Sequence, residues 1–228
     1  PSIDLYYERG LKNQQKVYAN IVGSYAKVET GRNYIEYDNA NTLFKEQFGL
    51  SSDKYSLIAE GIYEKGFTYG SLKFGAKHIQ SFTKQEVQQN GVFKSDLNQM
   101  ETSVFSEWNH SKDKFSCSLG LKANRVHFSN ISINKSYYNF LPKAMLGYRL
   151  NENSFIRYDV EMSQTNPTLV ELTDTEIRLD PYLAERGNLL LQPYSNLNNN
   201  LFYEHKKGLF TFNANLRHHY KHNPIMES

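Results

Sequence analysis

Cysteine and long apolar runs are the features that this sequence has least of. Cys117 is the only cysteine among 228 residues, which excludes a disulfide within the chain and a zinc site built on cysteines. No stretch approaches the about 18 consecutive apolar residues that a membrane-spanning helix needs. Residues 1–10 lack a basic start followed by an apolar core, so they do not read as a signal peptide. We expect either a cleaved leader or a chain that begins inside a longer protein, and we favour the second.

A strong charge of either sign is also missing. The net charge is +2, which gives no electrostatic basis for binding nucleic acid. The mean hydropathy of −0.65 is too polar for helical membrane spans. Aromatic residues nevertheless make up 14% of the chain, with 17 Tyr and 14 Phe. A polar average with many aromatics is typical of a transmembrane β-barrel, whose strands meet lipid and water on alternate residues.

Apolar and polar residues alternate with a period of two along about ten segments, which predicts β-strands. The alternation is clearest in segments 54–63, 100–108, 115–124, 138–149, 156–162 and 209–221. The polar face of several segments carries ionisable groups, such as Arg157, Asp159 and Glu161. A dry core does not tolerate such groups unpaired, whereas a water-filled lumen does.

The lengths of the expected strands and of their connections point the same way. The strands run over about 9–14 residues, close to the about 9–11 that a tilted strand needs to cross a bilayer. Short connections are expected at 10–15, 65–66, 110–113, 151–153 and 206–208, and long ones at 29–52, 81–96, 128–136 and 163–196. This alternation predicts an all-β, antiparallel up-and-down transmembrane β-barrel with short periplasmic turns and long external loops.

Aromatic residues gather near the ends of the expected strands. Examples are Tyr55, Tyr63, Trp108, Tyr138 and Tyr148. They match the interfacial aromatic girdles of membrane barrels. The alternative is that tyrosine is simply a good strand former.

The second part of the chain, from about 142 to 227, carries recognisable motifs. They are 166–172 (Asn-Pro-Thr-Leu-Val-Glu-Leu), 180–182 (Asp-Pro-Tyr), 186–193 (Arg-Gly-Asn-Leu-Leu-Leu-Gln-Pro) and 223–225 (Asn-Pro-Ile). With them the segment resembles the barrel of TonB-dependent receptors, in the outer-membrane β-barrel family abundant in Bacteroidetes. Leu189 stands where proline is usual, and Tyr194 where an acidic residue is common. The first 140 or so residues match in strand pattern alone.

The resemblance implies a location in the cell outer membrane and a role in import. The chain 1–228 would be one partial β-barrel domain from the later half of a barrel of about 22 strands. The intact protein would bind a scarce nutrient, such as a siderophore, a glycan fragment or a peptide. Its other partners would be outer-membrane lipid, a plug domain and the TonB system. Two alternatives remain: a non-transporting scaffold or adhesion barrel, and a soluble β-sandwich binding module.

Long loops are the expected location of ligand contacts. Tyr34 and Tyr37 in one loop, with Tyr182 and Arg186 in another, are candidates to stack on a sugar or to contact a peptide.

No pattern of residues indicates catalysis or a cofactor. The chain has no Gly-x-Ser-x-Gly, P-loop or His-Glu-x-x-His element. His205, His218, His219 and His222 crowd the last strands, but their spacing does not ensure that they converge on a metal, and histidines near a membrane boundary explain them as well. The acidic group from Glu171 to Asp180 fits a solvated external loop better than a calcium site. We expect a protein that is not an enzyme and that holds no cofactor.

Overall fold

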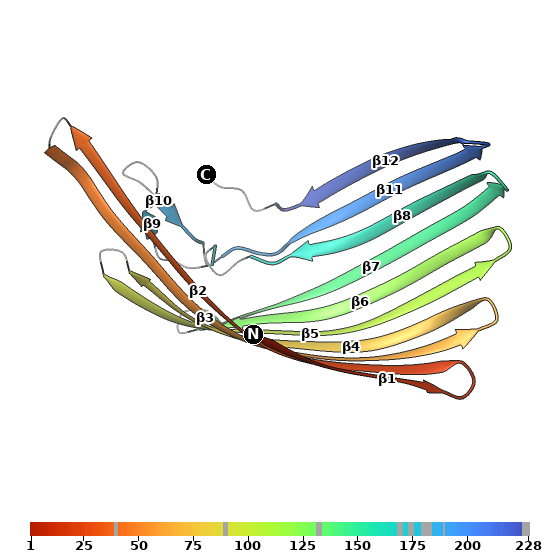
Figure 1. Ribbon diagram of the computed structural model, residues 1–228, viewed down its shortest axis with the longest axis horizontal. Helices are drawn as coiled ribbons and strands as arrows, with labels where there is room; N and C mark the ends of the chain where they lie inside the picture. The colour runs from red at the N-terminus through yellow and green to blue at the C-terminus, as the bar shows by residue number, and fades with distance from the viewer. Residues whose placement is uncertain are drawn as a thin grey trace.

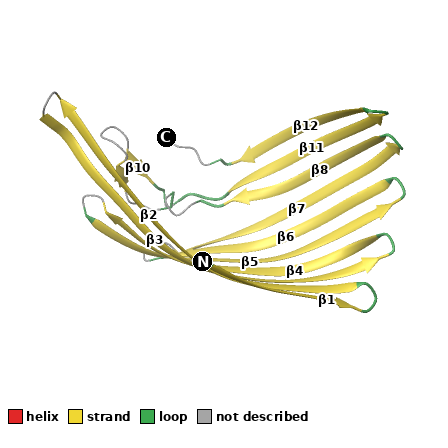
Figure 2. Cartoon of the chain, in the orientation of Figure 1, coloured by secondary structure: helices red, strands yellow, loops and turns green. Residues whose placement is uncertain are grey.

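The computed structural model describes residues 1–38, 41–88, 91–130, 134–167, 171–172, 176–178, 184–188 and 190–224. All regular elements in these ranges are strands, as Figure 2 shows. A helix long and apolar enough to cross a membrane is not found among these residues.

Ten strands form one continuous sheet in which each strand pairs antiparallel with the next. They are β1 (Ser2–Leu11), β2 (Gln15–Asp38), β3 (Asn41–Phe67), β4 (Gly70–Gln88), β5 (Val92–Lys112), β6 (Phe115–Ser129), β7 (Asn134–Asn151), β8 (Ser154–Thr165), β11 (Tyr194–Lys207) and β12 (Phe210–His222). The short strands β9 (Glu176–Arg178) and β10 (Ala184–Arg186) pair in a separate ribbon. The sheet is curved and open, with β1 and β12 at its two edges (Figure 1). The predicted all-β, up-and-down architecture is confirmed. The sandwich alternative is wrong, because the described strands do not form two large packed sheets.

Short turns join the strands at one end of the sheet, as expected, but three lie further along the chain than predicted. The turn expected at residues 65–66 falls at 68–69, because Lys65 and Gly66 still pair with β4. Asp113 and Gly208 lie in the next two displaced turns, with φ angles of 51° and 59°. Aspartate and glycine adopt this left-handed backbone more readily than most residues, which explains why the chain reverses there.

Three of the four expected long loops are instead extensions of the strands. Strands β2 and β3 stay paired out to Asp38 and Asn41, with one register shift beyond Glu36. Likewise β4 and β5 stay paired out to Gln88 and Val92, and β6 and β7 stay paired out to Ser129 and Asn134. Only the connection from β8 to β11 is long. The extensions carry polar residues on both faces, so they lack the apolar alternation by which strands were predicted.

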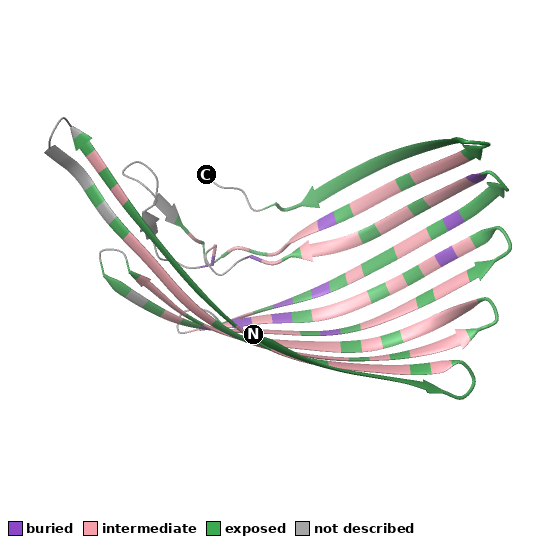
Figure 3. Ribbon diagram, in the orientation of Figure 1, coloured by how far each residue is buried: buried purple, intermediate pink, exposed green. Residues whose placement is uncertain are grey.

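The two faces of the sheet differ in polarity and in crowding. The face defined here as outer carries the exposed apolar side chains of each strand, such as Leu119, Leu121 and Leu146. The inner face carries charged and amide side chains, and most of its residues are half-buried. Figure 3 shows half-buried residues along the strands between the two edges of the sheet. The space around the glycines shows the same difference in crowding between the two faces. A Cβ at inner Gly75 would collide with the Phe105 ring, whereas outer Gly23 and Gly61 have no atom within 4 Å.

Aromatic residues border the apolar band of the outer face. At one border Tyr25 lies against Tyr55, with ring centroids 4.9 Å apart, and the next outer pair is Lys27 and Asp53. On β7, Tyr138 and Tyr148 are both exposed and outward. Ten residues cover about 33 Å of strand, which a tilt of about 40° projects to about 25 Å, the height of the apolar band in membrane barrels. The positions of these side chains therefore favour the girdle interpretation.

Candidate functional site

The inner face is crossed by a row of charged side chains whose sign alternates from strand to strand. The row runs through the cross-strand partners Lys16, Glu64, Lys73, Glu107, Gly120, Lys143 and Glu161, on strands β2 to β8. Because successive side chains of a strand point to opposite faces, antiparallel register places all of them on the same side of the sheet. Neighbouring opposite charges attract, so the row is electrostatically self-consistent.

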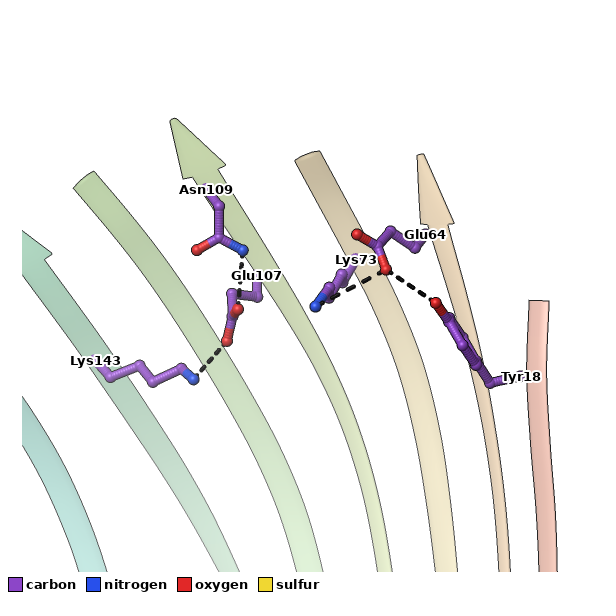
Figure 4. A network of polar contacts seen from close by, with 6 residues as sticks. All are labelled: Tyr18, Glu64, Lys73, Glu107, Asn109 and Lys143. Carbon is purple, nitrogen blue, oxygen red and sulfur yellow. Dashed lines mark hydrogen bonds and ion pairs between the residues drawn. The ribbon is translucent and has the colours of Figure 1, made fainter. Parts of the chain in front are cut away.

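Two clusters of this row are held by direct contacts, which Figure 4 shows from close by. The Lys73 ammonium lies 3.9 Å from a Glu64 carboxylate oxygen, to which the Tyr18 hydroxyl also donates a hydrogen bond of 3.5 Å. Lys143 Nζ lies 2.5 Å from Glu107, and the Asn109 amide donates to the same carboxylate at 2.9 Å.

Gly120 explains how Lys143 reaches its partner. Glu107 and Lys143 stand on β5 and β7, which are not neighbours, and Gly120 of β6 lies between them. A Cβ at Gly120 would collide with the methylene groups of Lys143. The missing side chain therefore provides the path along which Lys143 crosses β6.

Further along the inner face, similar polar contacts recur. Glu101 accepts hydrogen bonds from Lys122 at 3.4 Å and from Asn124 at 3.0 Å. On β8, Asp159 is bound by Arg157 at 2.9 Å and by Asn200 at 3.2 Å. Such a surface is costly to dehydrate, so it is suited to line a water-filled lumen and not to pack in a dry core. The chemistry that this wall offers is charge and hydrogen bonding to a polar solute or to a polar protein surface.

The connection from β8 to β11 contacts the inner face at the end of the sheet opposite the short turns, through Leu172. Leu172, which is 1% exposed, packs with Leu97, Val126, Phe128 and Tyr137 of β5, β6 and β7. The Phe128 and Tyr137 rings meet edge to face at 6.1 Å. This apolar cluster is defined here as the loop anchor.

Hydrogen bonds complete the loop anchor. The Tyr137 hydroxyl donates to the Leu191 carbonyl at 3.2 Å, and the Asn188 amide donates to the Glu171 carbonyl at 2.6 Å. The Asn188 side chain accepts the Leu190 amide at 2.8 Å. The motifs at 166–172 and 186–193 therefore join the two ends of this connection and fix it against the wall.

Sequence reasoning did not single out the inner residues of the loop anchor. The signal was present, because Leu97, Val126 and Phe128 are apolar at positions where the alternation expects a polar side chain. Three apolar residues out of phase on adjoining strands indicate that something covers them.

The predicted ligand contacts are distributed over separate places. Tyr34 lies half-buried on the inner face of β2, whereas Tyr37 is on the opposite face and 61% exposed. Arg186 ends β10 and is exposed. Tyr182 lies outside the described residues. The structure therefore does not bring Tyr34 and Tyr37 to one face, and their role in binding stays a prediction.

Two charged groups on the external hairpins have shifted pKa values. Hydrogen bonds from Gln88 at 3.0 Å and from Lys94 at 3.1 Å hold the pKa of the Glu86 carboxyl below its ordinary value. The Glu29 carboxylate, 2.5 Å from Lys27, raises the pKa of that ammonium. Lys27 is exposed and Glu86 is partly exposed, so water screens both groups and they support the external hairpins weakly.

The histidines of the last strands do not converge. His218 and His222 lie on the outer face of β12, while His219 lies on the inner face and contacts Asn198. His205 contacts Ser154 at 2.8 Å. Among the described residues, no group of three or more His, Cys, Asp or Glu side chains is arranged to hold a metal ion. Of the acidic group, only the Glu171 side chain belongs to that part of the chain.

Comparisons with known proteins agree with this architecture. A family model described as "Outer membrane protein beta-barrel family" matches residues 2–228. The fold is similar to the copper transporter OprC, with a TM-score of 0.69, 10% identity, and coverage of 91% of this chain and 36% of that chain. No curated protein matches the sequence.

Two further structures with a similar fold contain FpvAI or FpvA. One is an FpvAI–pyocin S2 complex, with a TM-score of 0.70 and 11% identity, covering 96% of this chain and 31% of that chain. The other is P. aeruginosa FpvA bound to a heterologous pyoverdine, with a TM-score of 0.59 and 10% identity, covering 90% and 30%. The chain thus spans about a third of the length of these proteins. At such identities the likeness shows the fold alone.

Proposed function

Because this chain belongs to the outer membrane protein β-barrel family and is located in the outer membrane, we propose that its sheet is part of the wall of a larger barrel that imports a scarce nutrient. The nutrient is a siderophore, a glycan fragment or a peptide. A plug domain of the full-length protein fills the lumen, and the TonB system supplies the energy. The observation that carries this proposal is the inner wall, where alternating charges and a fixed loop face one lumen.

Three features support a transporter over a scaffold. An adhesion barrel has no need of a row of charges on its inner face, whereas a transporter needs a wet wall against which a polar plug or solute can move. The loop anchor holds an external connection over the lumen, where it can contact an entering ligand. The structures with the same fold are described as a copper transporter and as FpvA bound to a pyoverdine with iron. We therefore propose transport, and not catalysis, as the activity.

The proposed ligand contacts lie on the external side. Tyr34, Tyr37, Tyr182 and Arg186 are the candidates, with Tyr34 on the inner face of the β2–β3 extension and Arg186 in the ribbon that the loop anchor carries. Tyrosine and arginine planes suit stacking on sugars and hydrogen bonding to carboxylates.

The test is uptake by cells that produce the full-length protein. We would compare a deletion strain with its complemented parent for the uptake of labelled ferric siderophores, oligosaccharides and peptides, with and without a protonmotive-force uncoupler. The proposal expects that uptake of one class is lost on deletion and is abolished by the uncoupler in the parent. If no class depends on the protein, the scaffold alternative replaces import.

A further inference from the structure

A polar cluster adjoins the apolar band on the outer face of β4 to β7. It occupies two adjacent cross-strand rows, one of His78, Thr102, Arg125 and Tyr138, the other of Gln80, Met100, His127 and Ser136. On β3 the corresponding positions are Ala59 and Leu57, so the polarity is confined to these four strands. The side chains of His78, Thr102, Arg125, His127 and Ser136 are defined here as the outer cluster.

Within the outer cluster, imidazole and hydroxyl groups contact one another, and the Arg125 guanidinium contacts one of the hydroxyls. His78 Nδ1 lies 2.8 Å from the Thr102 hydroxyl, and His127 Nδ1 lies 3.0 Å from the Ser136 hydroxyl. Arg125 donates to that Ser136 hydroxyl at 3.2 Å and stacks over the Tyr138 ring at 5.8 Å. Neither row contains an aspartate or glutamate. Within the described part of the chain, Arg125 therefore has hydrogen-bond and ring partners but no ion pair to balance its charge.

The position of the cluster is the border of the apolar band. On β6 the outer-face residues Leu119, Leu121 and Ala123 are apolar. Arg125 is the next outer-face residue along the strand, in the direction away from the short turns. The next outer row beyond the cluster holds Phe82, Asn98 and Ser129, and charges follow in the row after it, where Lys84 lies opposite Asp96. A cation at the border of the band is at the level of lipid headgroups, where arginine is tolerated because its charge stays in the polar layer.

We propose that the outer cluster binds the phosphate of an anionic lipid in the outer leaflet. The guanidinium offers a planar fork of donors that matches phosphate, and the imidazole and hydroxyl groups on both sides supply further donors. The acyl chains of the lipid lie along the adjoining apolar surface of Leu121, Val104 and Phe140, which are exposed by 38%, 56% and 61%. Free phosphate would leave that surface unused, which favours a lipid. This site lies on the opposite face of the wall from the proposed transport path, and it does not depend on import.

The test measures lipid binding to the protein as it exists, purified in detergent, by native mass spectrometry with diphosphoryl lipid A as the probe. R125Q is expected to weaken binding about tenfold, the loss given by one charge-assisted hydrogen bond. The double variant R125Q/H127Q is expected to bind no more tightly than the wild type binds dephosphorylated lipid A. The matched control is K27Q, which removes an outer-face cation outside the cluster, and it should bind as the wild type does.

Far-UV circular dichroism and the urea unfolding midpoint show whether each variant is folded. If R125Q does not fold, H127Q and S136A carry the same test, each with a smaller expected loss. Equal binding by the folded variants and the wild type would overturn the proposal. So would equal binding of phosphorylated and dephosphorylated lipid, or displacement of the lipid by inorganic phosphate at the same concentration. Nutrient uptake by cells that carry R125Q tests the proposed import function independently of lipid binding. The two proposals can therefore fail separately.

Discussion

Neighbouring residues of one strand meet different solvents in this protein. Leu121 and Ser118 stand three residues apart on β6, yet Leu121 lies on the outer face and Ser118 on the inner. The same substitution should therefore have unequal effects at the two positions. This contrast gives a direct test of which face meets lipid.

We expect Leu121→Arg to lower the free energy of unfolding by about 2–4 kcal/mol, the cost of placing arginine against mid-bilayer lipid. Ser118→Arg, its matched control, should change the free energy by less than about 1 kcal/mol, because its charge remains in water. Urea titration of the protein in phosphatidylcholine vesicles measures both. Similar losses at the two positions would show that the faces have been assigned wrongly.

The loop anchor depends on one leucine that is almost fully buried. Leu172→Ala should reduce the free energy of local opening of the connection by about 2–5 kcal/mol, since it removes a buried side chain from an apolar cluster. Leu190→Ala, at a site 80% exposed in the same connection, should have almost no effect. Hydrogen exchange of the Asn188 and Leu191 amides is the measurement. Unchanged protection in Leu172→Ala would mean that the hydrogen bonds of Tyr137 and Asn188, and not the apolar cluster, hold the connection.

The alternation of apolar and polar residues along a strand also determines which positions could be predicted from the sequence. The outer face could be predicted because lipid requires an unbroken apolar series, as in Leu119 and Leu121. Gly120 and Lys143 could not be linked from sequence, because their relation depends on the register of β6 against β7. Val126 and Phe128 break the polar series of the inner face, and the reason for the break is clear only once Leu172 is known to cover them.

At the scale of elements, the external extensions of the strands exceed the part that crosses the apolar band. Strand β2 has 24 residues and β3 has 27, whereas about 9–11 suffice to cross a bilayer. About half of the backbone groups of the hairpin are paired between its two strands, and water outside the membrane can bind the rest, so it needs no support from lipid. Sequence alternation predicted the crossing parts correctly but took the extensions for loops, since both of their faces are polar.

Removing the outer part of the β2–β3 hairpin should therefore leave the wall intact. We expect a chain in which residues 33–47 are replaced by Asn-Gly, a strong hairpin turn between the partners Arg32 and Phe48, to lose strand signal in proportion to the residues removed. Its urea midpoint in vesicles should remain that of the full chain. A control deletion of similar length from the crossing part, at residues 17–22 and their partners 58–63, should abolish insertion into vesicles. A lower midpoint for the external truncation would mean that the extension contacts and stabilises other parts of the protein.

At the scale of the whole molecule, the sheet has two unpaired edges. Every residue of β1 and β12 is exposed, as the uniform colour of β12 in Figure 3 shows. Long edges with free backbone groups invite further pairing. That these edges belong to a larger ring stays a prediction, which rests on the motifs at 166–172 and 186–193, because alternation alone specifies strands and not how many close a barrel.

The open sheet predicts how protection from amide hydrogen exchange differs between its central and edge strands. In the 228-residue chain in detergent, we expect protection to be highest in the central strands β5 and β6 and lowest in β1 and β12, because an edge strand opens by breaking one ladder and a central strand must break two. Mass spectrometry of hydrogen exchange, resolved by peptide, gives the profile. Exchange in β12 as slow as in β6 would mean that the edge has found a partner. Repeating the measurement at several protein concentrations distinguishes the two possibilities, because pairing between copies strengthens with concentration and pairing of β1 with β12 of the same chain does not.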